Sequence, residues 1–430
     1  MKKILRAAVS LLSILTLASC NQTKTSDKVS DSGTPSTSTK DSGSTVVTND
    51  TFTIKVGSDQ KVVDWVAGKA QTYLRANGFP NVKVESYQLS EGDADSKVAD
   101  WSAGPDVYAY ASDKILNLVK AGALAKVTSK NLTTLNTELG EDVMASVKVG
   151  DNYYGYPYTT NTFYLYYNGD AVTEEQSKTM NGLIAAAAAK GSDYKVAYNL
   201  NNGWYGIPFL CSYGARFNVT VNDTGTVTKI TSDFAEKALP AAKLIKSYFG
   251  NANVTLVDND QAAPNDSSKT VAQVTGSWKN EAYTSAVRNL KAAALPKIDD
   301  TTYAYTFMGY KDWGVNPQAY GSDVNRATAD QALAMYFSGK DFQLDYYRQY
   351  SNLPLNKEAN KDSTLATNQV NLAVQNEIAH SIPQSIVPTN VWSAYTSFYN
   401  TLTDAATTTD NQIKAALTAF DTAVQTIEAL

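Results

Sequence analysis

The chain has 430 residues and a formal net charge of -5; 18% of its residues are charged and 10% are aromatic. Nucleic-acid binding needs a basic face, so this composition argues against that class of protein. The 27 tyrosines and 6 tryptophans instead suit a surface that binds neutral polar ligands. The length predicts two or three domains.

The N-terminus has the layout of a bacterial secretion signal. Basic residues at the start precede a short apolar run over 7–17, and the sequence Leu-Ala-Ser-Cys then ends at Cys20. This ending resembles the lipobox of bacterial lipoproteins, which implies cleavage before Cys20 and acylation of that residue. The apolar run is too short to span a membrane. We therefore expect a lipid anchor on the outer face of the bacterial cell membrane; the alternative is an ordinary signal peptide with an incidental cysteine.

Residues 21–50 consist mostly of Ser, Thr, Asp, Lys and Gly, with few side chains to bury. Such a composition cannot offset the entropy that folding costs, so we predict a disordered tether. The second cysteine, Cys211, follows two apolar residues. If Cys20 is acylated, Cys211 has no disulfide partner, and its apolar neighbours predict a core position.

The region after the tether has the pattern of strands alternating with helices. Its periodicity predicts strands over 51–56, 82–87 and 106–110, and helices over 62–74 and 113–121. This order predicts an α/β fold with a mostly parallel sheet covered by helices. Further helices are predicted over 181–190, 235–249 and 411–428. Ligands of open α/β sheets bind beyond the carboxyl ends of the strands, so the residues that follow strands are the candidates for a site.

A series of short blocks resembles one protein family. The blocks are, in order, Gly104-Pro105-Asp106-Val107-Tyr108 with Asp113-Lys114, Tyr156-Pro157-Tyr158 with Leu165-Tyr166-Tyr167-Asn168, Asn199 to Trp204 with Pro208, Gly276-Ser277-Trp278, Phe307 to Asn316, Leu353-Pro354-Leu355, and Pro388 to Trp392. From about residue 52 onward the chain resembles the family 1 extracellular solute-binding proteins of ABC importers, which include the maltose/maltodextrin-binding proteins. The resemblance rests on the number and order of the blocks, because none is specific alone.

The resemblance implies a two-lobed α/β fold of the periplasmic-binding-protein kind (type II) with a hinge between the lobes. Residues 51–159 and 308–355 would form lobe 1, and residues 160–307 and 356–430 would form lobe 2. The implied partners are an oligosaccharide of the maltodextrin kind and the permease subunits of an ABC importer. We expect a monomer without enzymatic activity, cofactor, metal or nucleic acid.

The implied site combines rings with polar groups, because rings suit the apolar faces of a sugar and carboxylates or amides suit its hydroxyl rim. The resemblance places Tyr110 on one lobe and Trp204, Trp278 and Trp392 on the other. The implied polar contacts are Asp59, Gln60, Asp113, Asn161 and Asn202. A ligand that bridges these groups would shift the protein toward a closed state.

Several positions depart from the maltodextrin-binding pattern. Gln60 stands where relatives have Lys, and Asn161 and Asn202 stand where they have Glu, so the expected site is less charged and the particular sugar is not determined. Structural alternatives also remain at this stage. Each aromatic residue could instead belong to the core, Asp113 could cap the helix that follows it, and Asn202-Gly203 could form a turn.

Other functional classes find little support in the sequence. The only histidine, His380, lies in a helical stretch over 373–382 and is expected to be a solvated helix residue. We find no nucleophile elbow, phosphate-binding loop or Cys/His cluster. A surface glycosidase would need two close carboxylates, which the sequence alone does not exclude. The same fold with a peptide, polyamine or anion as ligand, and a structural adhesin, remain alternatives.

Overall fold

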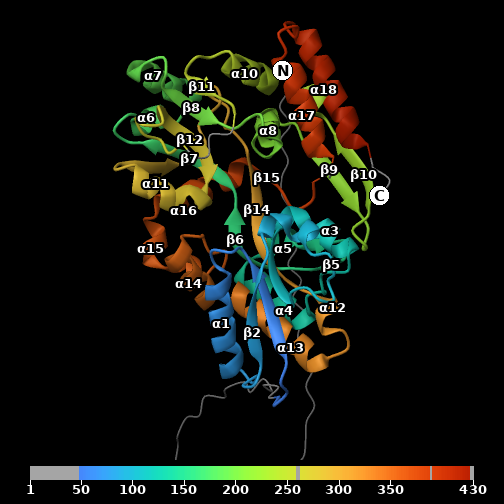
Figure 1. Cartoon of the computed structure of the whole chain (residues 1–430). Helices are drawn as coiled ribbons and strands as arrows, with labels where there is room; N and C mark the ends of the chain where they lie inside the picture. Colours follow the sequence, from blue (N-terminus) through green and yellow to red (C-terminus); the bar gives the residue numbers. More distant parts are fainter. Residues whose placement is uncertain (1–47, 258–261, 388–389, 427–430) are drawn as a thin grey trace, which may run out of the picture. The chain divides into compact units, whose positions relative to one another are not determined.

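The computed structural model describes residues 48–257, 262–387 and 390–426. Cys20 and most of the predicted tether lie outside the described residues. The described chain contains two main β-sheets, each covered by helices, and strands β6 and β14 lie where the chain passes between them (Figure 1). Within these residues, no helix combines the length and the apolar character needed to span a bilayer.

The first sheet has the strand order β15-β14-β3-β1-β2, and β6 also pairs with β14. Its strands are β1 (Thr53–Ser58), β2 (Lys83–Gln88), β3 (Val107–Ala111), β6 (Tyr156–Asn161), β14 (Thr306–Val315) and β15 (Ser381–Pro383). Strand β1 is parallel to β2 and β3, whereas β14 is antiparallel to β3 and β6. The helices of this part are α1 (Val63–Ala76), α2 (Ala94–Lys97), α3 (Ile115–Lys120), α4 (Ser129–Glu138), α5 (Glu141–Ala145), α12 (Pro317–Tyr320), α13 (Val324–Ser338) and α14 (Lys340–Tyr350).

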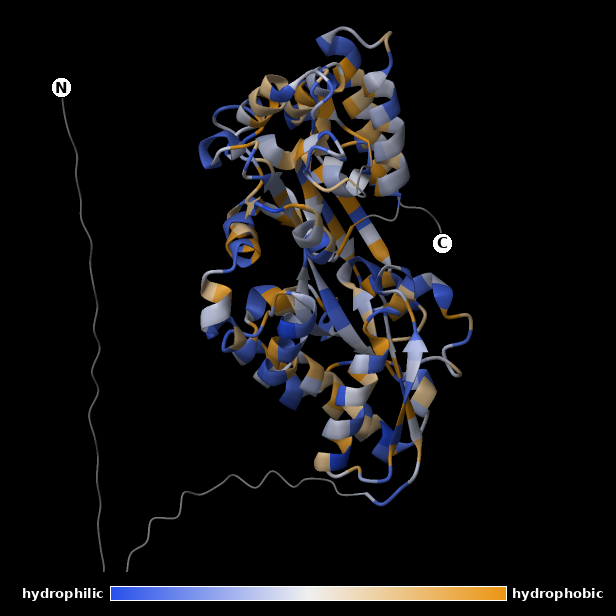
Figure 2. Cartoon of the chain, turned by 60° about the vertical axis from the view of Figure 1, so that its left-hand side comes forward, coloured by the Kyte–Doolittle hydropathy of each residue, from blue (hydrophilic) through white to orange (hydrophobic). Residues whose placement is uncertain are grey.

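Local sequence patterns account for these elements. Helix α1 buries Val66, Ala70 and Leu74, which are spaced four residues apart and therefore share one face. Hydrophobic positions are frequent in the central strands and alternate with hydrophilic positions along the helices (Figure 2). The predicted strands over 51–56, 82–87 and 106–110 and the helix over 62–74 are confirmed, with ends shifted by one or two residues.

The second sheet has the strand order β11-β8-β12-β7-β13. Its strands are β7 (Phe163–Asn168), β8 (Lys195–Tyr198), β11 (Val254–Thr255), β12 (Thr270–Gly276) and β13 (Leu290–Ala293). Strand β8 is parallel to β11 and β12, and β7 is antiparallel to β12 and β13. The helices are α6 (Glu174–Ser177), α7 (Met180–Lys190), α8 (Gly203–Leu210), α9 (Phe234–Lys237), α10 (Leu239–Phe249), α11 (Asn280–Ala286), α15 (Ser363–Ala366), α16 (Gln369–Glu377), α17 (Val391–Thr403) and α18 (Asp410–Gln425).

The helix predicted over 235–249 is in fact two helices, α9 and α10. Pro240 lies in the first turn of α10, where a missing backbone N–H removes no helical hydrogen bond. In the middle of one continuous helix, the same proline would remove such a bond. The helices predicted over 181–190 and 411–428 correspond to α7 and α18, and Cys211 is buried in the core, as predicted.

The chain passes from the first sheet to the second between β6 and β7, and Thr162 is the residue at this crossing. Its hydroxyl donates to the backbone oxygen of Phe307 over 2.7 Å, which ties the crossing to β14. On β14, a Cβ at Gly309 would lie 3.0 Å from the backbone oxygen of Asn161 and 2.3 Å from Oε1 of Gln384, so a larger residue there would displace the Gln384 side chain. These two adjacent strands connect the lobes of a two-lobed α/β fold, and we refer to them as the hinge strands, or the hinge.

A hairpin of the second lobe contacts the first lobe away from the hinge. Strands β9 (Phe217–Val221) and β10 (Val227–Ser232) form this hairpin, and Asp223 lies in its turn. The backbone N–H of Asp151 donates to Oδ1 of Asp223 over 2.8 Å. Side chains of both strands also pack against the core of the first lobe.

Candidate functional site

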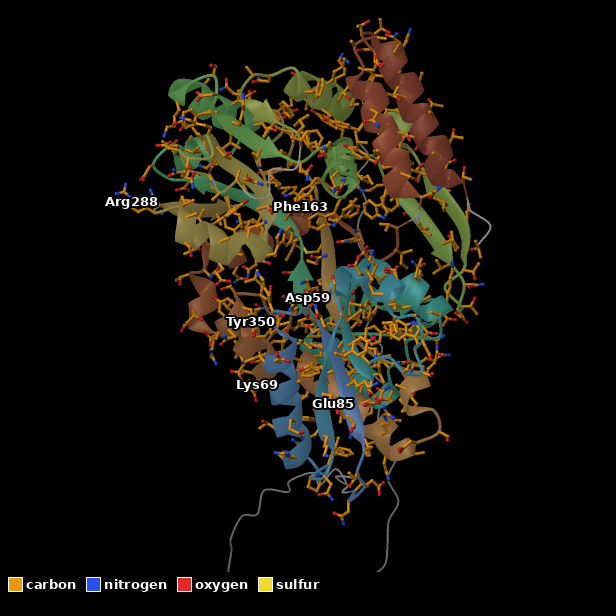
Figure 3. The ribbon with its side chains drawn as sticks, in the orientation of Figure 1. Asp59, Lys69, Glu85, Phe163, Arg288 and Tyr350 are labelled. Carbon is orange, nitrogen blue, oxygen red and sulfur yellow. The ribbon has the colours of Figure 1, made fainter. Side chains whose placement is uncertain are left out.

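Two of the predicted tryptophans lie side by side on the second lobe. Trp204 stands in the first turn of α8, and Trp278 stands in the short 3-10 turn Ser277–Lys279 that follows β12. Their ring centroids are 5.5 Å apart at an interplanar angle of 50°. Trp278 is 43% exposed, whereas Trp204 is half-buried and its ring centroid lies 4.9 Å from that of Phe163. Phe163, which Figure 3 labels, therefore supports the pair from the core side.

Trp392 completes this group. It is half-buried near the start of α17, and its ring centroid lies 6.0 Å from that of Phe307 on β14. A Cβ at Gly203 would lie 3.2 Å from Cε3 of Trp392, so glycine at the start of α8 lets this ring approach the helix that carries Trp204. The structure thus brings together the three tryptophans that were predicted from separate sequence blocks.

The Gly-Ser-Trp block has a steric explanation. A Cβ at Gly276 would lie 1.9 Å from Cζ3 of Trp278, because the ring folds back over the glycine. We expect Gly276→Ala to displace this ring and to weaken ligand binding about tenfold, which is the scale of one aromatic contact. Titration calorimetry and tryptophan fluorescence would measure the change. Gly68→Ala is the control, since no atom lies within 4 Å of a Cβ there; equal affinity in both variants would contradict the prediction.

Tyr110 does not join the site. Its ring is 0% exposed in the core of the first lobe, and its hydroxyl donates to the backbone oxygen of Tyr154 over 3.4 Å. The prediction that Tyr110 offers a ring to a ligand is therefore wrong for this structure. The physical reason is its strand: β3 lies between β1 and β14, and all five of its residues are buried.

Carboxylates gather at the carboxyl end of β1. Asp59 follows this strand and accepts a hydrogen bond from the backbone N–H of Glu91 over 3.2 Å. Glu91 is 3% exposed; it accepts a hydrogen bond from the hydroxyl of Tyr158 over 2.6 Å and forms an ion pair with Lys311 of the hinge strand. Burial and the nearby Glu91 carboxylate raise the pKa of Asp59 to about 6.

Sequence analysis missed Glu91. It follows β2, which is the parallel neighbour of β1, so the ends of the two strands bring Glu91 to Asp59. The rule that identified Asp59 also applied to this strand end and could have found Glu91. Gln60 is exposed beside them, and its side-chain oxygen accepts a hydrogen bond from Gln88 over 3.2 Å.

Asp113 lies after β3 at the same edge of the sheet. It is half-buried, its carboxylate is 3.2 Å from Nζ of Lys114, and burial raises its pKa. The alternative prediction was that Asp113 caps the following helix. No side-chain cap hydrogen bond is present at the starts of the 3-10 turn Ser112–Lys114 or of α3, both within the described residues. The side chain therefore has no capping role.

The two predicted asparagines differ. Asn202 is exposed and caps α8, because its Oδ1 accepts a hydrogen bond from the backbone N–H of Trp204 over 2.8 Å. The structural alternative for this residue is thus confirmed, and the cap fixes the turn that carries Trp204. Asn161 is half-buried at the end of β6, opposite Gly309. Gln384, which sequence analysis missed, is buried beside Gly309, and its Oε1 has no hydrogen-bond partner within the described part of the chain.

A cavity of about 580 Å³ also touches the hinge, but it is a different place. Thr160 and Met308 of the hinge strands line it together with parts of α5 and α16, and none of the nine predicted ligand residues does.

His380 was expected to be a solvated helix residue, and the structure differs from that expectation. Its ring is half-buried and stacks on Tyr303, with centroids 4.0 Å apart.

Comparison with known proteins identifies the family of the chain. The sequence profile of a family described as bacterial extracellular solute-binding protein matches residues 70–374. A galactooligosaccharide-binding protein of Bacillus subtilis is 24% identical over 343 residues, which cover 73% of this chain and 78% of that protein. A maltooligosaccharide ABC transporter solute-binding lipoprotein of Streptococcus pneumoniae is 25% identical over 403 residues, which cover 89% and 87% of the two chains.

Solved structures show the same fold. A maltodextrin-binding protein from L. casei without ligand superposes with a TM-score of 0.76 at 21% identity, covering 88% of this chain and 100% of that one. A maltose-binding periplasmic protein from Listeria monocytogenes in complex with maltose gives a TM-score of 0.68 at 20% identity, covering 86% and 97%. Because the family profile spans most of the chain, this protein belongs to the bacterial extracellular solute-binding proteins, the ABC importer components that its sequence blocks resemble.

Proposed function

We propose that this protein captures a neutral oligosaccharide of the maltodextrin or galacto-oligosaccharide kind between its lobes. The observation that carries the proposal is the group formed by Trp204, Trp278 and Trp392 on the second lobe. Indole rings bury the C–H faces of sugars at a small entropic cost. Asp59 of the first lobe supplies carboxylate oxygen atoms that accept hydrogen bonds from sugar hydroxyls, and the buried Glu91 holds Asp59 in place through its backbone N–H. The names of two relatives point to the same ligand class.

The delivery step follows from the family. We propose that the loaded protein, a monomer, docks on the permease subunits of an ABC importer and is held on the outer face of the cell membrane by acylated Cys20. The crossings between lobes are proposed near residues 159–160 and 307–308, with a return near 355. Ligand binding favours the closed arrangement because the ligand contacts both lobes only when they are closed.

A thermal-shift and calorimetry screen tests this function. The panel contains maltodextrins, galacto-oligosaccharides and spermidine, and a ligand that binds only the folded protein raises its melting temperature. We expect the oligosaccharides to stabilise the protein and to be recovered uncleaved. A shift with spermidine alone would assign the carboxylates to an amine ligand, and cleavage of labelled oligosaccharide would indicate a glycosidase; either result would reject the proposal.

Binding should depend on pH through Asp59. Its pKa of about 6, raised by burial and by Glu91, means that the carboxyl is ionised at neutral pH and gains a proton as the pH falls through 6. The ionised form accepts hydrogen bonds at both oxygens, so we expect affinity to fall several-fold from neutral pH to about pH 5. Asp59→Asn should bind more weakly at neutral pH and lose this dependence, whereas the exposed control Asp64→Asn should keep it. An unchanged pH profile in Asp59→Asn would assign the titration to another group.

A further inference from the structure

An aromatic patch lies beside the carboxylates of the first lobe, between α1 and α14. It consists of Trp65, Tyr346 and Tyr350. The ring centroid of Trp65 is 5.5 Å from that of Tyr350 at an interplanar angle of 89°, and the centroids of Tyr346 and Tyr350 are 5.2 Å apart. Trp65 and Tyr350 are half-buried, and Tyr346 is buried beneath them. Figure 3 labels Tyr350 and Asp59 on this lobe, with Lys69 further along α1.

Continuous contacts join this patch to the proposed site. The ring of Tyr346 meets that of Tyr158 edge to face, with centroids 5.5 Å apart. The Tyr158 hydroxyl donates to Glu91, and the backbone N–H of Glu91 donates to Asp59. Burial raises the pKa of Tyr346, and the carboxylates of Glu91 and Asp59 raise it further, which reports their proximity. The patch therefore borders the carboxylates at the ends of β1 and β2.

The two sides of the patch are not equivalent. Nζ of Lys69 lies 5.2 Å from the Trp65 ring centroid and 2.6 Å from a carboxylate oxygen of Asp345, so this ion pair occupies the side away from Asp59. Tyr350 ends α14, and Ser351 after it has a left-handed backbone with φ of +59°, which turns the chain away. Tyr350 thus remains half-exposed at the end of its helix, supported by Trp65 and Tyr346.

Tyr110 is buried, so the ring that was predicted for the first lobe is out of a ligand's reach. We propose that Tyr350, supported by Trp65, forms an outer subsite for one further sugar ring of an oligosaccharide whose inner rings bind at the tryptophans of the second lobe. This inference rests on the proposed function and adds a preference for longer chains. A short ligand fills the inner positions alone, whereas a longer one also stacks on Tyr350 and gains affinity from that contact.

Calorimetry with short and long members of both oligosaccharide series tests the subsite, with maltose and maltoheptaose as the reference pair. Tyr350→Ala should weaken binding of the long ligand about tenfold and leave the short ligand unchanged, and Tyr350→Phe should keep both affinities. Tyr73→Ala is the matched control. Tyr73 is also half-buried on this lobe, but it stacks on Tyr336, with centroids 4.2 Å apart, and has no contact with the patch among its ring pairs in the described structure.

The outcomes separate this inference from the proposed function. Equal weakening of short and long ligands by Tyr350→Ala would indicate a structural role and overturn the subsite. A wild-type protein that binds short and long ligands equally would also overturn it, while the proposed function would stand. A wild-type protein that binds neither series would overturn both. Loss of the long-chain advantage in Tyr350→Ala alone supports the subsite.

Discussion

A variant carrying both Trp204→Ala and Trp278→Ala is expected to bind its oligosaccharide at least about a hundredfold more weakly than the wild type. Each indole is expected to contribute about 1–3 kcal/mol of binding free energy, the range for a well-placed ring at a binding site. The rings are 5.5 Å apart, so their contributions should not simply add. Calorimetry on both single variants and the double variant would measure this coupling.

Stability data are needed to interpret that result. Trp278 is 43% exposed, so its removal should hardly change the melting temperature. Trp204 packs on Phe163, and its removal should destabilise the fold by about 1–2 kcal/mol. Tyr303→Ala is the control, because this ring is 46% exposed on the second lobe but stacks on His380. Normal affinity in the folded double variant would show that the tryptophan group is not the binding surface.

In the proposed function, the tryptophan group and the carboxylates divide the recognition of a sugar between the lobes. The second lobe presents rings that suit the C–H faces, and the first lobe presents the half-buried Asp59 and Asp113 near its strand ends, which suit the hydroxyl rim. If neither set alone encloses a sugar, as we propose, strong binding requires both lobes. This division explains why the expected affinity depends on closure about the hinge at Thr162 and Gly309.

The sequence predicted those parts of the molecule that depend on local periodicity or on short motifs. Strands β1 and β2 and helix α1 follow from hydrophobic spacing over a few residues. Trp204 and Trp278 follow from glycine-containing blocks, and the structure shows the reason at Gly276, whose missing side chain leaves room for the indole. These features depend on residues that are close together in the chain, so they could be predicted from the sequence.

The residues that sequence analysis placed wrongly or missed are those whose surroundings depend on tertiary contacts. Tyr110 lies in a strand with the expected pattern, but periodicity does not tell what covers each face of that strand, and here the segment at Tyr154 and Gly155 lies over the Tyr110 hydroxyl. Glu91 meets Asp59 only because β2 pairs with β1. Gln384 reaches Gly309 from a segment about 75 positions later in the chain. Such contacts depend on strand order, which the sequence patterns did not specify.

Glu377 provides a test of stability that does not depend on the ligand. It ends α16 with 1% of its surface exposed, and its carboxylate accepts a hydrogen bond from the backbone N–H of Leu295. No cation forms an ion pair with it among the residues that the structure describes. Burial raises its pKa to about 8, although the hydrogen bond from Leu295 opposes the shift.

The raised pKa fixes the sign of the pH dependence. Between about pH 4.5 and pH 8 the folded protein keeps a proton on Glu377 that the unfolded chain releases, so the contribution of this group to stability is lost as the pH rises through that window. We expect Glu377→Gln, which stays neutral and keeps an oxygen for Leu295, to raise the free energy of unfolding by about 2–4 kcal/mol at pH 8 and to change it little near pH 4. Denaturant titrations across this range would measure the difference, with Glu281→Gln on the exposed side of α11 as the control. A uniform gain at every pH would show that packing, rather than the proton, decides the effect.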